Sequence, residues 1–309
     1  MKKALFFILL LIPIYSFAQD QDTITYYNKY WEEVCCKDSA YFYKIGLTDH
    51  GIFENGEITD YFNKSGKVQM TVKYLNWEKH GACIWYYENG TECAVGNYVY
   101  GEFSMLKAWD KNGNKTVSEG NGKITWYFEG GNGNIKSTGS YFNGRRNGVW
   151  YYYNPNGKII EEINYFKGLA IMVSAWDNEG EKKIVEDGDG VYLRKYSNEK
   201  IASIGQYKNG IKTGEWKYYY ANGLIESSGK YRNGIQVGYW AWYYNNGKKR
   251  KEGNFKEGNF DGEITWWYSD GIISSKGKME NGKRIGEWIW YDKEGYPISS
   301  RNYTTTASE

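Results

Sequence analysis

The chain has 309 residues, and 19% of them are aromatic, whereas only three are prolines, which suits long and uninterrupted strand pairing. Removal of Lys2 and Lys3 with an N-terminal export segment would leave 37 basic residues against 37 acidic ones. This balance leaves no excess of positive charge of the kind that nucleic-acid binding requires, so we expect no nucleic-acid partner.

Residues 1–18 have the features of a signal peptide. Two lysines precede an apolar run over residues 4–14, and Ser16 and Ala18 occupy the small-residue positions before Gln19. The run is too short to span a membrane as a helix, and no later segment is apolar enough to do so. We therefore expect export to the periplasm or the extracellular space, with no transmembrane segment in the mature chain.

Residues 19–55 are less regular than the rest and contain two strand-like runs, TITYYNKYWEEV and AYFYKIG. We interpret this segment as a divergent cap on the first edge of a sheet. Export makes disulfides possible, and Cys35, Cys36, Cys83 and Cys93 all lie in the N-terminal third. Because Cys83 and Cys93 are expected on opposite faces of one hairpin, we favour bonds between the cap and the first repeats, among the three connectivities that four cysteines allow.

Residues 56–295 repeat one pattern with a period of about 24 residues. In each unit an aromatic-rich run follows an opening glycine, a second glycine lies fifteen residues after the first, and a large side chain follows two residues later. We expect about ten hairpins, each too small to be stable alone, so neighbouring hairpins must pair edge to edge. The clearest copies are GEWKYYYANG, GYWAWYYNNG, GEITWWYSDG and GEWIWYDKEG, which open at Gly214, Gly238, Gly262 and Gly286.

A turn is predicted where each aromatic run ends in Asn-Gly or Asp-Gly. Both central residues of a type I′ turn need a positive φ, and these residue pairs tolerate it. The predicted turns are Asn222-Gly223, Asn246-Gly247 and Asp270-Gly271.

Folding a unit about this turn sets Trp216 opposite Gly229, and Tyr231 opposite Gly214. We expect each large ring to cover the glycine that it faces, because a glycine in a strand leaves a gap that an aromatic side chain can fill. The structural glycines are accordingly Gly214, Gly229, Gly238, Gly253, Gly262, Gly277 and Gly286.

Two units depart from the pattern in the same way. MLKAWDKNGNKTVSEGNG from Met105 matches MVSAWDNEGEKKIVEDGDG from Met172, and both have a shortened second strand before the opening glycines Gly122 and Gly190. This match indicates that a longer block was itself duplicated. Residues 296–309 are expected to form the C-terminal end and a polar tail.

Strand alternation places Trp216, Tyr218 and Tyr220 on one face, and Lys217 and Tyr219 on the other. We expect the rings mainly to hold the sheet together in place of a core, and the same ladder to offer a binding surface. The candidate binding ladder is Trp150, Trp216, Tyr218, Tyr220, Trp240, Trp242, Tyr244, Trp266 and Trp288.

The motif YYANG…SGKYRNGIQVGYW and its copies resemble the bacterial variant of the MORN repeat over nearly all of residues 56–295. The resemblance implies an all-β fold, an elongated single-layer antiparallel sheet of tandem hairpins that is twisted or curved, and a non-catalytic role in scaffolding or recognition. Exported bacterial relatives are often labelled antitoxin-like. The predicted signal peptide argues against that label, since a neutraliser of a cytosolic toxin should stay in the cytosol.

Few residues are candidates for chemistry. His50 and His80 have no second ligand at metal spacing and are expected in solvated loops. DKNGNK at Asp110 has its glycine in the wrong place for a calcium loop, so we expect a plain turn there. The run KKRK at residues 248–251 is expected to be a solvated face of one hairpin. We therefore predict no enzymatic activity, no cofactor and no metal.

A protein partner bound along the aromatic ladder is the leading functional hypothesis. Carbohydrate or cell-wall binding is the alternative, because GYWAWYYNNG faintly resembles the repeats of choline-binding wall modules. Those repeats lack the second strand that each unit has here.

Overall fold

A computed structural model describes residues 22–27, 33–34, 37–40, 42–47, 55–75, 78–99, 101–128 and 133–304. The signal peptide predicted at residues 1–18 lies outside these ranges, as do Cys35, Cys36 and His50.

The described residues form 25 strands of one sheet and a single 3-10 turn, Lys37–Ser39. The N-terminal strands are β1 (Asp22–Tyr27), β2 (Glu33–Val34), β3 (Phe42–Leu47), β4 (Asn55–Phe62), β5 (Val68–Leu75), β6 (Glu78–Tyr86), β7 (Glu92–Val99), β8 (Glu102–Trp109) and β9 (Lys115–Ser118). The central strands are β10 (Asn121–Tyr127), β11 (Ile135–Phe142), β12 (Arg145–Tyr153), β13 (Ile159–Phe166), β14 (Leu169–Trp176), β15 (Lys183–Glu186), β16 (Asp189–Lys195) and β17 (Ile201–Lys208). The C-terminal strands are β18 (Ile211–Tyr219), β19 (Ile225–Arg232), β20 (Ile235–Tyr243), β21 (Lys249–Lys256), β22 (Asn259–Trp267), β23 (Ile273–Glu280), β24 (Lys283–Tyr291) and β25 (Pro297–Tyr303).

From β3 onward every strand pairs antiparallel with the next strand in the chain, as far as β25. At the N-terminal end β1 lies between β2 and β3, so the predicted cap is continuous with the repeat array. The consecutive pairs from β4/β5 to β24/β25 make eleven hairpins. The predicted single antiparallel sheet of tandem hairpins is therefore confirmed.

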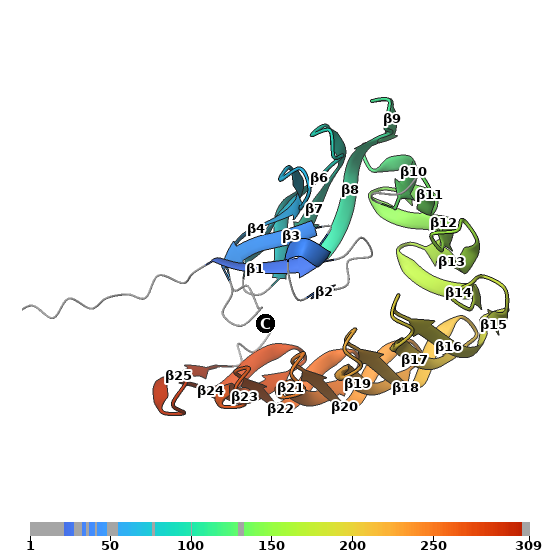
Figure 1. Cartoon of the computed structure of the whole chain (residues 1–309). Coiled ribbons are helices and arrows are strands. Elements are labelled where there is room, and N and C mark those ends of the chain that lie inside the picture. The colour runs from blue at the N-terminus through green and yellow to red at the C-terminus, as the bar shows by residue number, and fades with distance from the viewer. Residues whose placement is uncertain are drawn as a thin grey trace, which may run out of the picture.

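The sheet follows an open arc, which changes direction near the short strands β9 and β15 (Figure 1). These two strands belong to the two divergent units, so the duplicated block corresponds to two corners of the array. Each corner buries the same three apolar positions, which are Met105, Ala108 and Val117 in one unit and Met172, Ala175 and Val185 in the other.

Backbone hydrogen bonds between turns close each corner. Gly144 N donates to Gly120 O at 2.9 Å, Met105 N donates to Gly144 O at 2.8 Å, and Gly120 N donates to Leu106 O at 3.0 Å. A Cβ on Gly120 would lie 2.4 Å from Gly144 N, so only glycine allows this approach. The second corner repeats all three bonds through Gly188, Gly210, Met172 and Val173.

The predicted register of the hairpin is confirmed, because Trp216 pairs with Gly229 and Gly214 pairs with Tyr231. The predicted reason for Gly214 is wrong, however. A Cβ at this position would meet only Gln206 Oε1, at 4.0 Å, so no ring covers it. Its φ of +65° lies in the left-handed region that favours glycine. The equivalent Gly238, Gly262 and Gly286 also have positive φ and open surroundings.

The rings cover glycines of the preceding unit, not the glycines that they pair with in their own hairpin. A Cβ on Gly205 would lie 2.1 Å from Trp216 Cδ2, and a Cβ on Gly229 would lie 2.2 Å from Trp240 Cδ2. At this junction three residues, 238–240, lie opposite the single residue Gly229 and form a bulge. The bulge lets the indole of Trp240 fold back onto Gly229. The same overlap joins Trp150 to Gly139 and Trp288 to Gly277.

The turn type was also predicted wrongly at the first turn of each unit. Gly223 has a φ of +92°, but Asn222 is not among the residues with positive φ, and Gly223 N donates to Tyr220 O at 2.8 Å. The two-residue turn with two positive φ values lies between units, at Asn233 (+52°) and Gly234 (+77°). Asn222 Oδ1 instead accepts from Leu224 N at 2.9 Å, as in an Asx turn.

The array extends beyond its predicted end at Gly295. β25 pairs with β24 from Gly286↔Tyr303 to Tyr291↔Pro297, so most of the segment 296–309 completes the last hairpin. Residues 305–309 lie outside the described part of the chain.

Candidate interaction surface

Four of the six tryptophans of the predicted ladder are buried between units. Trp150, Trp216, Trp240 and Trp288 are no more than 1% exposed, so none of them can present a ring face to a ligand. Each indole Nε1 donates to a carbonyl of the preceding unit, at 3.2 Å from Trp216 to Gln206 O and at 3.2 Å from Trp240 to Lys230 O. These side chains therefore act as joints between hairpins.

The tyrosines of the ladder at the hairpin turns also join units. Tyr220 Oη donates to Tyr243 O at 2.6 Å, and Tyr244 Oη donates to Trp267 O at 2.6 Å. The remaining members, Tyr218, Trp242 and Trp266, are half-buried on the same face as the indoles. The structure therefore brings the nine residues together along one face, which we call the ring face.

Long cationic side chains cover the ring face. Lys212 Nζ lies 4.3 Å from the ring centre of Trp216, and Arg284 Cζ lies 4.5 Å from that of Trp288. Lys251 Nζ lies 4.3 Å from the ring centre of Trp242. The run at residues 248–251 was expected to be solvated, and for Lys251 this expectation was wrong. Lys251 is half-buried because its cross-strand partners are Trp242 and Trp266.

The opposite face carries exposed apolar side chains between the two corners. Phe142, Val149, Phe166 and Leu169 are 60%, 41%, 63% and 69% exposed. Phe166 and Leu169 are direct cross-strand partners. Phe142 pairs with Arg145, and the side chain of Arg145 reaches the turn between Phe166 and Leu169, where its Cδ would lie 3.4 Å from a Cβ on Gly168. We call this group of four residues the apolar patch.

Sequence reasoning missed the apolar patch, although a signal for it exists. Phe166 directly follows the large ring Tyr165, a position that is filled by Lys208, Arg232, Lys256 and Glu280 in later units. Earlier units have Leu75, Val99 and Phe142 at this position, so the signal is the large exposed phenylalanine rings of the two units between the corners.

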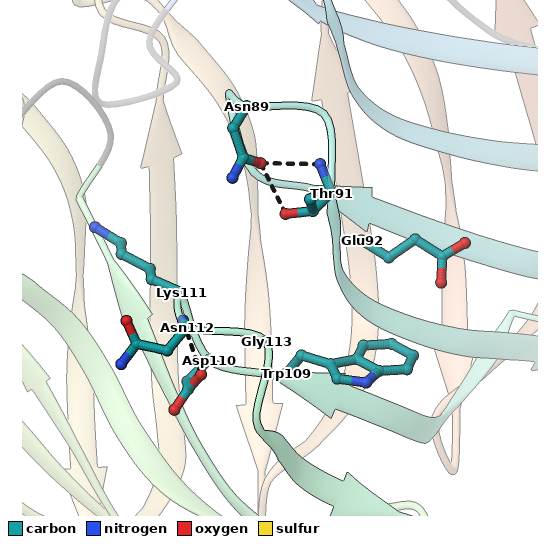
Figure 2. Close-up of a pocket in the computed structure, with 8 residues that line it drawn as sticks. All are labelled: Asn89, Thr91, Glu92, Trp109, Asp110, Lys111, Asn112 and Gly113. Atoms are coloured by element: carbon teal, nitrogen blue, oxygen red, sulfur yellow. Dashed lines mark hydrogen bonds between the residues drawn. The ribbon is translucent and has the colours of Figure 1, made fainter.

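An open pocket of about 350 Å³ lies between the turn at residues 89–92 and the turn at residues 109–113 (Figure 2). Asp110 and Asn89, which line it, already have local hydrogen-bond partners. Asp110 Oδ1 accepts from Asn112 N and Asn114 N, both at 2.9 Å, and these bonds with the Asn114 side chain lower the pKa of Asp110. Asn89 Oδ1 similarly accepts from Thr91 N at 2.9 Å. The segment at Asp110 is a turn, as predicted, with its carboxylate oxygens occupied.

A family model described as "MORN repeat variant" matches residues 79–92, 146–167, 188–209, 212–233 and 236–257. Each match begins two residues before an opening glycine, in phase with the hairpins of the structure. The chain contains MORN-variant repeats.

Other comparisons add little to the assignment of MORN repeats. No curated protein matches the chain. One similar solved structure is "Crystal Structure of TcdB2-TccC3-Cdc42", with 12% identity over 87% of this chain and 16% of that chain, at a TM-score of 0.15. Another is "ASR Alternansucrase in complex with isomaltononaose", with 14% identity over 70% of this chain and 16% of that chain, at a TM-score of 0.14. The chain thus spans about a sixth of each of these proteins.

The cysteines and histidine of the first MORN repeats are structural. Cys83 is buried, and burial raises the pKa of its thiol to about 12, which makes it a poor nucleophile. Cys83 and Cys93 lie in different apolar clusters. His80 was expected in a solvated loop, but it lies half-buried in β6, where it pairs with Lys73.

Within the described ranges, no group of three or more His, Cys, Asp or Glu side chains is placed to hold a metal ion. A search of the same residues finds no helix long and apolar enough to cross a membrane.

Proposed function

We propose that this protein is exported and acts as a non-catalytic module that binds another protein through the apolar patch. The observation that carries this proposal is the contrast between the two faces. The four tryptophans are enclosed between units, whereas Phe142, Phe166 and Leu169 are each 60% exposed or more. Contiguous exposed apolar side chains on a folded protein typically mark a contact site for another protein.

Carbohydrate or cell-wall binding is the weaker alternative. Sugar-binding sites use open aromatic faces on which a pyranose ring can stack. In the motif that supported this alternative, Trp240 is closed to such stacking by burial, and the half-buried Trp242 has Lys251 over its ring. An antitoxin-like neutralising role would be one form of protein binding, and it would require a toxin in the compartment to which the chain is exported.

The test is crosslinking mass spectrometry on the native exported chain, followed by binding measurements with the purified partner. The double variant F166A/L169A should lose the partner, whereas R232A/I235A, at the equivalent positions of a later unit, should keep it. N-terminal sequencing of the mature protein should find Gln19 first. Equal partner recovery with both double variants, at unchanged melting temperature, would remove the patch from the function.

A further inference from the structure

The ring face carries more positive than negative charge in the C-terminal part of the array. Lys212, Lys251 and Arg284, which we call the cation row, all point to this face, because their cross-strand partners are Tyr207, Trp242 and Met279. In β18–β25, within the described stretch 133–304, no Asp or Glu pairs across the strands with a ring-face residue, and Glu226, in the bulge beside Tyr218, acts on Tyr218 and Arg250.

The carboxylates of these units lie on the opposite face, where they meet their own lysines. Glu215 pairs with Lys230 across the strands, with 3.9 Å between Oε1 and Nζ. Glu263 pairs with Lys278 in the same way, at 3.6 Å. Within β18–β25 the register thus places these carboxylate–lysine pairs on one face and the cation row on the other, where Glu161 of β13 is a carboxylate that acts on Lys212.

The cation row is held in place by neutral groups. Lys212 Nζ donates to Tyr218 Oη at 2.8 Å, Arg284 Nη1 donates to Tyr303 Oη at 3.3 Å, and Lys251 stacks on Trp242 and Phe260. Aromatic rings replace only part of the hydration that a cation loses on burial. Burial lowers the pKa of Lys212 although the carboxylate of Glu161 acts to raise it, and burial together with Arg250 lowers the pKa of Lys251 to about 8. An arriving carboxylate would supply the missing negative charge.

We propose that the cation row is a docking surface for an acidic segment of a partner protein, which runs across the strands from β18 to β24. This inference rests on the proposed protein-binding function and adds a second contact to it. The three cations lie on β18, β21 and β24, so neighbouring cations are three strands apart, which corresponds to a distance on the order of 14 Å across the sheet. An extended segment that rises roughly 3.3 Å per residue matches this spacing with a carboxylate at every fourth position.

The test measures binding of a fluorescent peptide with glutamate at every fourth residue to the full mature chain, by fluorescence anisotropy at low and high salt. The matched peptide has glutamine at those positions. We expect the glutamate peptide to bind with a strong salt dependence and the glutamine peptide not to bind. The variant K212M/K251M, which keeps the apolar stems, should weaken binding by about fivefold or more.

Two controls separate charge from packing and this proposal from the apolar patch. K230M/K278M removes two lysines from the opposite face and should change affinity by less than about twofold. K212R/K251R keeps the charge and should retain binding even if K212M/K251M is less stable. Equal loss in K230M/K278M, or binding of polygalacturonate but not of the peptide, would overturn the proposal. Retention of the native partner by K212M/K251M but not by F166A/L169A would overturn the cation row alone and leave the proposed function intact.

Discussion

At the scale of single residues, glycine has two separate roles in each unit. The opening glycine, such as Gly238, has a φ of +64° and no neighbour within 4 Å of a Cβ. The second glycine, such as Gly229, is covered by the indole of Trp240. The first role concerns backbone conformation and the second concerns space.

The two roles predict different costs of substitution. Gly229→Ala should lower the free energy of unfolding by about 2–3 kcal/mol, because the indole of Trp240 must move. Gly238→Ala should cost about 1 kcal/mol, the strain of a left-handed alanine in open space. Urea unfolding of both variants measures the difference, and equal costs would contradict the assignment.

Asp60 makes stability depend on pH. It is buried, with Lys44 Nζ 3.8 Å from its Oδ1, and burial raises its pKa from 3.8 to about 6 despite Lys44 and Lys79. The folded chain therefore binds this proton more tightly than the unfolded chain, so stability should fall as the pH rises from about 4 to about 6. Asp60→Asn should gain up to about 3 kcal/mol at pH 7 over the parent and flatten this part of the profile. Chemical unfolding of both proteins between pH 4 and 7.5 tests the sign.

At the scale of the hairpin element, neighbouring units match by size. Where a unit supplies a tryptophan, the preceding unit supplies a glycine, as with Trp216 and Gly205. Where Cys83 takes the place of the tryptophan, its partner in the preceding unit is Val72. In the hairpin β24/β25 Arg301 pairs with Trp288 at the position of the covered glycine.

Size matching predicts which units can be deleted. Removal of residues 214–237 brings Trp240 onto Gly205 and should leave a folded, shorter array. Removal of residues 238–261, of equal length, brings Ile264 onto Gly229 without an indole, and the void should cost roughly 3 kcal/mol more. Thermal unfolding of the two deletions compares them directly. The same melting temperature in both would show that matching between units does not matter.

At the scale of the whole molecule, two corners set the curvature of the array. Both are built from a shortened strand, β9 or β15, and from a hydrogen-bonded pair of glycines in neighbouring turns. Because the corners lie on either side of β10–β13, they set the direction of the apolar patch relative to the cation row (Figure 1).

A substitution at a corner should open the arc. A Cβ on Gly188 would lie 2.3 Å from Gly210 N, and the backbone must separate to admit it. Gly234→Ala is the matched control, because Gly234 has a similar φ of +77° but its Cβ would meet only a side-chain methyl group, Ile211 Cγ2, at 2.8 Å, and no backbone atom. Gly188→Ala should cost about 2 kcal/mol more than the control and increase the radius of gyration in small-angle X-ray scattering. An unchanged radius would mean that the glycine pair does not hold the corner.

The sequence by itself determined the hairpin unit, the strand register and the position of the two irregular units, because glycine spacing and alternation act within one unit of the chain. Trp216 and Gly229 were paired correctly for this reason. The turn type was assigned wrongly because each unit has two glycine turns, and only the backbone φ values distinguish them.

The tertiary structure alone decided what each ring covers and which surface remains open. Trp216 lies over Gly205 because residues of the next strand arch at the junction between units, and this arch depends on two hairpins docking, not on either sequence alone. The same docking buries four of the six tryptophans of the predicted ladder, leaves Phe166 and Leu169 exposed on the other face, and turns the array at its two corners.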